Sequence, residues 1–105
     1  MKLVGPEFVL DYLQHTKDCI LIDIREPYEI ALLKIDCQNV PMGAFSQVYN
    51  AYSSYKQVIL MCQSGKRAEA LANFMETQYN VDNIYILEGG LNAWLESKCP
   101  PTLSL

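Results

Sequence analysis

Three short apolar runs, separated by segments with helical periodicity, constrain the fold of this chain more than any other feature. The runs are CILIDI (residues 19–24), QVILMC (57–62) and IYIL (84–87). Each is short, contains β-branched residues and is apolar on both faces, as strands inside a covered sheet are. Strands that alternate with helices form a mainly parallel sheet with helices on each side. The sequence therefore predicts an α/β fold.

The segments between the apolar runs predict the helices. Apolar residues recur at helical spacing over residues 6–15, where Pro6 suits the first helical turn. A short second helix is predicted to open at Pro27. The remaining predicted elements are a small strand at 39–41, helices around 44–52 and over 68–79, and a helix that follows Gly89 and Gly90.

Length and charge narrow the classes of protein to which the chain can belong. Its 105 residues suit a single domain spanning residues 1–105. The formal net charge of −4 provides no overall positive field, so neither nucleic acid nor an anionic membrane is an expected partner. The apolar runs are shorter than the roughly 20 residues that span a bilayer. Without an apolar stretch of signal-peptide length at the N-terminus, a cytoplasmic location is expected.

The four cysteines, Cys19, Cys37, Cys62 and Cys99, are spread along the chain without a C-x-x-C pair. This spacing argues against a structural zinc site and against a dithiol redox motif. Neither a metal nor another cofactor is expected. In a cytoplasmic protein the thiols should be free, so that one of them can be reactive while the others pack.

The stretch CQSGKR, residues 62–67, is the candidate site. Cys62 ends the second apolar run, and ligands in open α/β sheets bind beyond the carboxyl ends of the strands. Backbone N–H groups of residues 63–67 and the N-terminus of the following helix would stabilise a thiolate there. Gly65 permits a tight turn, and Lys66 and Arg67 add full positive charges that attract a small oxyanion.

Three stretches together resemble the rhodanese homology domain. CQSGKR is similar to its six-residue loop C-x-x-G-x-[R/T], LIDIRE (21–26) to its early strand with D-x-R-E, and ILEGGLNAW (86–94) to its closing G-G-x-x-x-W segment. The resemblance spans roughly residues 5–97, in the expected order. It implies a mainly parallel sheet of about five strands with helices on both faces.

The resemblance also implies sulfur transfer through a persulfide. The Cys62 thiolate would take a sulfane sulfur from thiosulfate or from a protein persulfide and pass it to cyanide or a thiol. Candidate protein partners are a cysteine desulfurase and proteins of cofactor biosynthesis or tRNA thiolation. Alongside Cys62, the site would comprise the loop residues Gln63, Ser64, Gly65, Lys66 and Arg67, with the two cations on the anionic end of the donor.

Other functions within the resemblance stay open. Related phosphatases and arsenate reductases have a loop one residue longer, so the shorter loop here favours sulfur. Glu29 stands where two-domain thiosulfate enzymes carry a cation, and its charge would repel a dianion. The alternatives are therefore a sulfur carrier or regulatory module with little thiosulfate turnover, and an inactive interaction domain, against which the intact Cys62 argues.

Several further residues have two readings each. Asp23 and Arg25 could be a catalytic carboxylate and a second anion clamp, but a structural ion pair is favoured. Cys37 lies in a connection shorter than the family's usual G-H-I-x-G-A segment, and could be a resolving thiol or, as favoured, simply buried. His15 is expected to be a solvated helix-end residue, and Trp94 a core residue.

Overall fold

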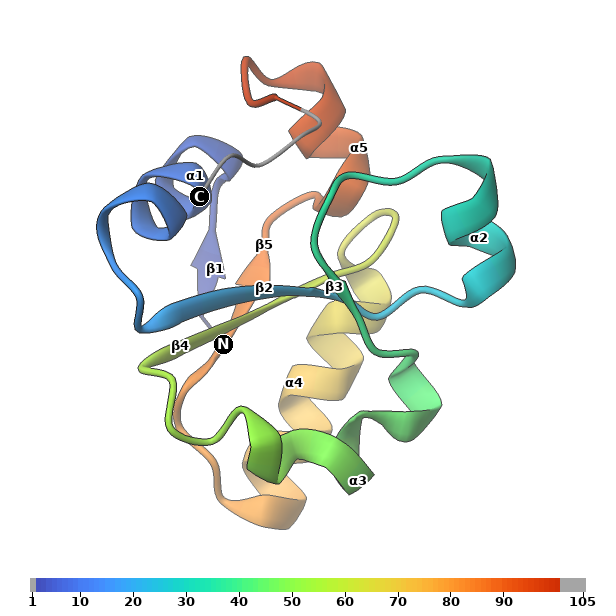
Figure 1. Ribbon diagram of the computed structural model, residues 1–105. Coiled ribbons are helices and arrows are strands. Elements are labelled where there is room, and N and C mark those ends of the chain that lie inside the picture. Colours follow the sequence, from blue (N-terminus) through green and yellow to red (C-terminus); the bar gives the residue numbers. More distant parts are fainter. Residues whose placement is uncertain (1, 101–105) are drawn as a thin grey trace.

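The computed structural model describes residues 2–100 and contains one parallel sheet (Figure 1). The strand order is β1-β5-β4-β2-β3, and every neighbouring pair is parallel. The α/β architecture predicted from the sequence is confirmed. Met1 and residues 101–105 of the expected single domain lie outside the described residues. The strands are β1 (Leu3–Val4), β2 (Cys19–Asp23), β3 (Gln38–Asn39), β4 (Gln57–Met61) and β5 (Ile84–Leu87).

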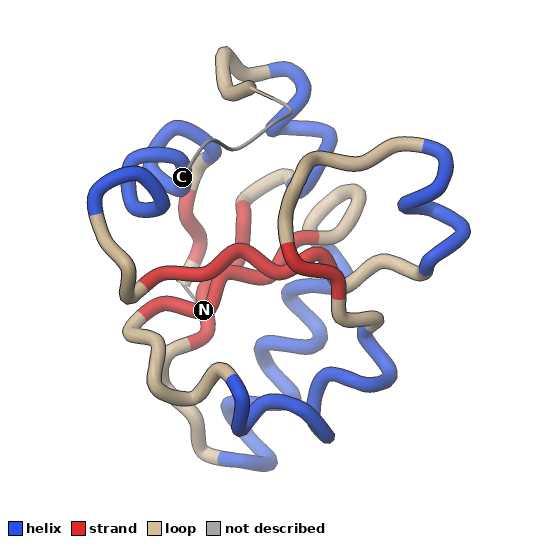
Figure 2. The backbone as a smooth tube through the Cα atoms, viewed as in Figure 1, coloured by secondary structure: helices blue, strands red, loops and turns tan. Residues whose placement is uncertain are grey.

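Helices cover both faces of the sheet, as expected for parallel strands joined by helices. Figures 1 and 2 show α1 and α5 on one side of the strands and α3 and α4 on the other, with α2 beside the carboxyl end of β2. The helices are α1 (Pro6–His15), α2 (Pro27–Leu32), α3 (Phe45–Val48), α4 (Lys66–Tyr79) and α5 (Gly90–Glu96), with 3₁₀ turns η1 (Met42–Ala44) and η2 (Tyr49–Ala51).

Side chains of the central strand β4 alternate between two hydrophobic cores. Leu60 and the following Cys62 pack in the core shared with α3 and α4, whereas Ile59 and Met61 pack in the core shared with α1 and α5. All four are fully buried. Burying one large aliphatic side chain stabilises a fold by about 1.5–3 kcal/mol, so a strand buried on both faces is held firmly. The end of β4 is therefore a rigid base for the residues that follow.

Local boundaries differ from the sequence expectations in several places, and β2 and β4 each end one residue earlier than the apolar run that predicted them. Strand β1 was not predicted. Strand β3 covers residues 38–39 instead of 39–41, although the N–H groups of Val40 and Met42 still donate to the carbonyl oxygens of Asp23 and Ile24. The helix expected around 44–52 is a short α-helix between two 3₁₀ turns. Helix α4 begins at Lys66, two residues before the predicted start, because Gly65 adopts φ +98° and caps it.

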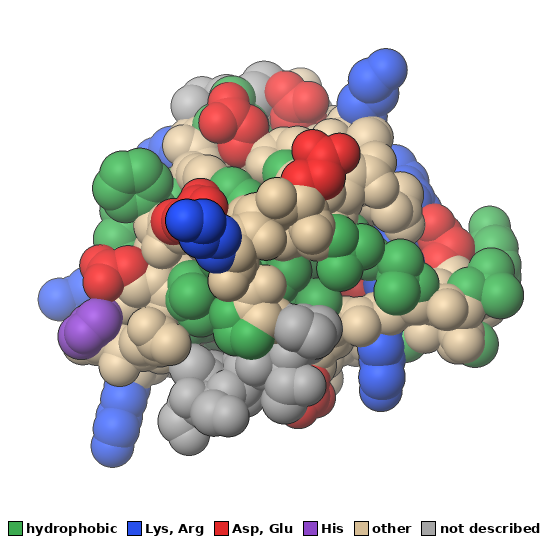
Figure 3. Space-filling model, turned by 90° about the horizontal axis from the view of Figure 1, so that it is seen from above, with side chains coloured by type: hydrophobic (Ala, Val, Ile, Leu, Met, Phe, Trp, Pro, Cys, Tyr) green, Lys and Arg blue, Asp and Glu red, His purple; other side chains and the backbone are tan. Residues whose placement is uncertain are grey.

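The surface of the molecule carries charges of both signs. Figure 3, a view from above Figure 1, shows Lys and Arg side chains interspersed with Asp and Glu, without a broad basic patch on that face. Among residues 2–100, no helix is long and apolar enough to cross a membrane.

Candidate active site

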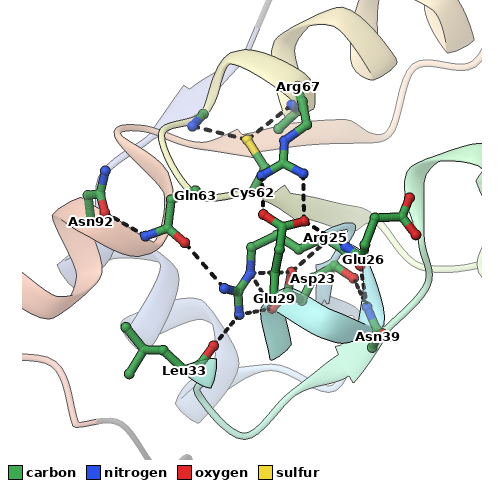
Figure 4. A network of polar contacts seen from close by, with 12 residues as sticks. Asp23, Arg25, Glu26, Glu29, Leu33, Asn39, Cys62, Gln63, Arg67 and Asn92 are labelled. Carbon is green, nitrogen blue, oxygen red and sulfur yellow. Dashed lines mark hydrogen bonds and ion pairs between the residues drawn. The ribbon is translucent and has the colours of Figure 1, made fainter. Parts of the chain in front are cut away.

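Cys62 lies directly beyond the carboxyl end of β4, in the turn that leads into α4. Its sulfur accepts hydrogen bonds from two backbone N–H groups, that of Gly65 at 3.1 Å and that of Ala68 at 3.4 Å (Figure 4). The first belongs to the turn and the second to the first turn of α4, where the helix carries its partial positive charge. Two N–H donors and a helix N-terminus therefore converge on this sulfur.

Ala68 is a contributor that the sequence reading missed. The predicted loop comprises the six residues of CQSGKR, and Ala68 is the residue directly after it. A backbone donor leaves no signature in its own side chain. The available signal was the helix start, since the first N–H groups of any α-helix have no partner within the helix.

The N-terminus of α5 holds the loop from the opposite side. The N–H groups of Leu91 and Asn92 donate to the carbonyl oxygens of Cys62 and Gln63, at 2.8 and 3.0 Å. The Gln63 side-chain amide also donates to the Asn92 side chain, at 2.6 Å (Figure 4). The ILEGGLNAW segment thus binds the loop that carries the thiol, a role beyond the turn expected at its two glycines.

Asp23 and Arg25 form a buried ion pair at the end of β2. Their side chains are 2% and 1% exposed, and Arg25 donates from Nε to both carboxylate oxygens at 3.1 Å and from Nη2 at 2.9 Å. Arg25 also donates to the Gln63 side chain at 3.2 Å and to the Leu33 carbonyl at 2.7 Å. Because its donors are engaged by protein groups, the arrangement fits the structural reading of this pair better than an anion clamp.

Arg67 is placed differently from the expectation that it would be free to bind a donor. Its two terminal nitrogens each donate to one oxygen of Glu29, both at 2.8 Å (Figure 4). This contact holds the pKa of Glu29 down at about 2 and raises the pKa of Arg67. From the sequence, Glu29 was expected to repel a dianion directly. In the structure its carboxylate instead accepts the hydrogen bonds of Arg67.

Lys66 and Ser64 lie at the open side of the loop. Both are exposed, and Lys66 forms no ion pair within the described part of the chain. The six loop residues therefore divide into a buried thiol with its N–H donors, a tethered Gln63, an engaged Arg67 and two solvent-facing side chains.

The other titratable candidates lie away from these contacts. His15 is exposed and pairs with Asp11 at 3.0 Å. Cys37 packs against the core on the face of the sheet opposite Cys62, and both thiols are free. Burial raises the pKa of Cys37 to about 12 and that of Cys19 to about 11. These placements fit plain packing of Cys37 and give no support to a resolving role.

Metal ligation has no candidate cluster here. Between residues 2 and 100, no group of three or more His, Cys, Asp or Glu side chains is positioned to hold an ion.

The family model of the rhodanese-like domain matches residues 8–97. The chain belongs to the rhodanese-like domain family. A protein named Sulfurtransferase from Allochromatium vinosum is 31% identical over 99 residues, which cover 92% of this chain and 91% of that protein. The fold, the loop and this relative support sulfur transfer as the general activity.

Two further proteins to which this chain is similar are longer than the matched region. The Adenylyltransferase and sulfurtransferase MOCS3 of Drosophila virilis is 32% identical over 107 residues, which cover 90% of this chain but only 24% of that protein. The solution structure of the polysulfide-sulfur transferase homodimer from Wolinella succinogenes is 30% identical, with a TM-score of 0.71, covering 95% of this chain and 77% of that one. This chain thus spans about a quarter of the length of the Drosophila relative.

Proposed function

We propose that the protein is a sulfurtransferase that carries a sulfane sulfur as a persulfide on Cys62. The observation that supports this most directly is the position of the Cys62 sulfur. At the N-terminus of α4 it accepts hydrogen bonds from the backbone N–H groups of Gly65 and Ala68. Such donors stabilise the thiolate needed for attack and can stabilise the charge of the persulfide that follows.

The reaction has two displacement steps at sulfur. In the first, Cys62–S⁻ attacks the outer sulfur of a donor R–S–SH, the donor's S–S bond breaks, and R–S⁻ leaves with the electron pair, so that Cys62–S–SH remains. With thiosulfate, the leaving group is sulfite and the product is Cys62–S–S⁻. In the second, cyanide or a thiolate attacks the outer sulfur and the Cys62 thiolate is restored. When cyanide is the acceptor, it takes up the outer sulfur and becomes thiocyanate, and no external oxidant or reductant is needed.

A second candidate function is a sulfur carrier that receives sulfur from a protein persulfide, such as that of a cysteine desulfurase, and turns over thiosulfate poorly. The observation that favours it is the ion pair between Arg67 and Glu29, which leaves the loop arginine less available to an anionic small molecule. Acceptors in cofactor biosynthesis or tRNA thiolation fit either function. A cytoplasmic location is proposed for both.

Intact-mass measurement tests the proposal. Incubation with thiosulfate or with a small persulfide should add one sulfur atom to the protein, and cyanide should remove it as thiocyanate. Cys62→Ser should gain no transferable sulfur, while Cys37→Ser, whose thiol packs on the other face of the sheet, should behave as wild type. Sulfur transfer to cyanide by Cys62→Ser at the wild-type rate would refute a persulfide at this residue.

A further inference from the structure

We propose that Glu29 determines the class of sulfur donor, so that the site selects persulfides over small dianions such as thiosulfate. The inference rests on the proposed function, because it concerns the first step of that reaction. It follows from which charges near Cys62 are already engaged by protein groups.

Both arginines near the loop are neutralised by carboxylates. Arg25 is held by Asp23 in a pair that is almost completely buried. Arg67, the cation that contributes to the field at Cys62, holds both oxygens of Glu29. An arriving dianion therefore meets two neutral pairs at the arginines, and Lys66 is the loop cation that has no ion-pair partner among the described residues.

Glu29 is fixed in this position from two directions. Besides Arg67, one of its oxygens accepts the backbone N–H of Glu26 at 2.9 Å, which ties the carboxylate to the first turn of α2. Its side chain is 18% exposed, so water competes only in part for these contacts. A two-point contact between a planar guanidinium and a carboxylate is the strongest geometry that an arginine forms, and thiosulfate would have to displace it.

A persulfide donor requires less from the site. In the step Cys62–S⁻ + R–S–SH → Cys62–S–SH + R–S⁻, the transferred group carries no charge, or a single negative charge when the donor persulfide is ionised, and the leaving thiolate carries one negative charge. Thiosulfate arrives with two negative charges and leaves as sulfite with two. The N–H groups of Gly65 and Ala68 serve the sulfur in both cases, so the difference between donors lies in the need for Arg67.

The decisive comparison uses two donors and three proteins. The proteins are wild type, Glu29→Gln, and Glu26→Gln as a control for charge. Glu26 is the N-cap of α2, its side chain accepts the backbone N–H of Glu29, which a Gln oxygen can also do, and its carboxylate does not contact Arg67. The second-order rate of sulfur addition to Cys62 is measured by rapid quench and intact mass, with thiosulfate and with cysteine persulfide. Removing the Glu29 charge should raise the thiosulfate rate about tenfold and change the persulfide rate by less than about twofold, and Glu26→Gln should change neither.

A binding measurement separates this inference from the function on which it rests. Titration with sulfate, an unreactive dianion, is followed through the amide NMR signals of Gly65 and Ala68, and Glu29→Gln should bind sulfate about tenfold more tightly than wild type. Should Glu29→Gln fail to fold, Glu29→Asp, whose shorter side chain weakens the two-point contact, is expected to shift both readouts in the same direction.

The outcomes are distinguishable. An unchanged ratio of thiosulfate to persulfide rates in Glu29→Gln, with unchanged sulfate affinity, overturns the role of Glu29. If wild type acquires sulfur from neither donor, the proposed function fails, and the sulfate titration still decides whether Glu29 withholds Arg67 from dianions.

Discussion

The backbone N–H of Leu91 donates a hydrogen bond of 2.8 Å to the carbonyl oxygen of Cys62, so the start of α5 fixes the turn that carries the thiol. The preceding residue, Gly90, has φ +61°, and a Cβ built on it would stand 2.3 Å from the same oxygen. The contact between these two segments is closer than any residue with a side chain allows. The second glycine of the G-G pair is therefore required by packing against the loop.

Gly90→Ala should destabilise the protein and disrupt the loop. The new Cβ meets backbone atoms, which cannot move cheaply, and the positive φ adds strain, so we expect the free energy of unfolding to fall by about 2–4 kcal/mol. Urea denaturation measures the loss, and intact mass measures sulfur addition in the fraction that remains folded, where we expect it to be slower than in wild type.

Gly43→Ala is the matched control, because a Cβ at Gly43 has no neighbour within 4 Å. It should change the free energy of unfolding by less than about 0.5 kcal/mol. Equal stability of the two alanine variants would show that α5 does not pack against the loop in this way.

Asp23→Asn should be severely destabilising. It leaves the Arg25 guanidinium buried without its carboxylate, and removing one partner of a buried pair costs about 3–5 kcal/mol. The exposed pair of Lys56 and Asp18, 3.9 Å apart, provides the comparison, and Asp18→Asn should cost less than about 0.5 kcal/mol. Chemical denaturation of both variants measures the difference, and similar losses would contradict a structural role for Asp23.

The ion pair of Glu29 with Arg67 should make part of the stability dependent on acid pH. The pKa of Glu29 is about 2 in the folded protein against an ordinary value of 4.5, so its contribution is complete above the ordinary value and is lost as the pH falls towards 2. Because Arg67 is 39% exposed, we expect only about 1 kcal/mol at neutral pH.

Urea midpoints of wild type and Glu29→Gln, measured from neutral pH down to about pH 2, test this expectation. The gap between the two proteins should be largest at neutral pH and close towards the acid end. A gap that stays constant with pH would show that the carboxylate charge of Glu29 does not stabilise the fold.

Cys19 and Cys37 should be poor nucleophiles in the folded protein. Burial raises their pKa values to about 11 and about 12, so almost none of either is thiolate near pH 8. Iodoacetamide should alkylate both at least about a hundredfold more slowly than in guanidinium chloride, where burial is lost. Peptide mapping by mass spectrometry reads each site separately, and rapid native alkylation of Cys37 would show that its thiol is open to reagents.

Local patterns predicted some elements closely. Helix α1 spans residues 6–15 and β5 spans 84–87, as expected, because a proline at the helix start and an uninterrupted apolar run are signals contained in adjacent residues. Cys62 was placed at the end of a buried strand by the same kind of signal. Strand β1 was missed because two residues carry no periodicity, and Leu3 and Val4 are strand residues only through pairing with Ile86 and Leu87.

The sequence by itself determined the α/β class, the parallel sheet and the location of the thiol at a strand end, because these depend on the order of apolar runs, glycines and prolines along the chain. Only the tertiary structure decided what the charged groups contact. Arg67 and Glu29 come from different helices, and Asn92 reaches Gln63 from a third. The partner of a charged side chain is known only once the fold brings distant segments together, and for Arg67 that partner is the carboxylate of Glu29.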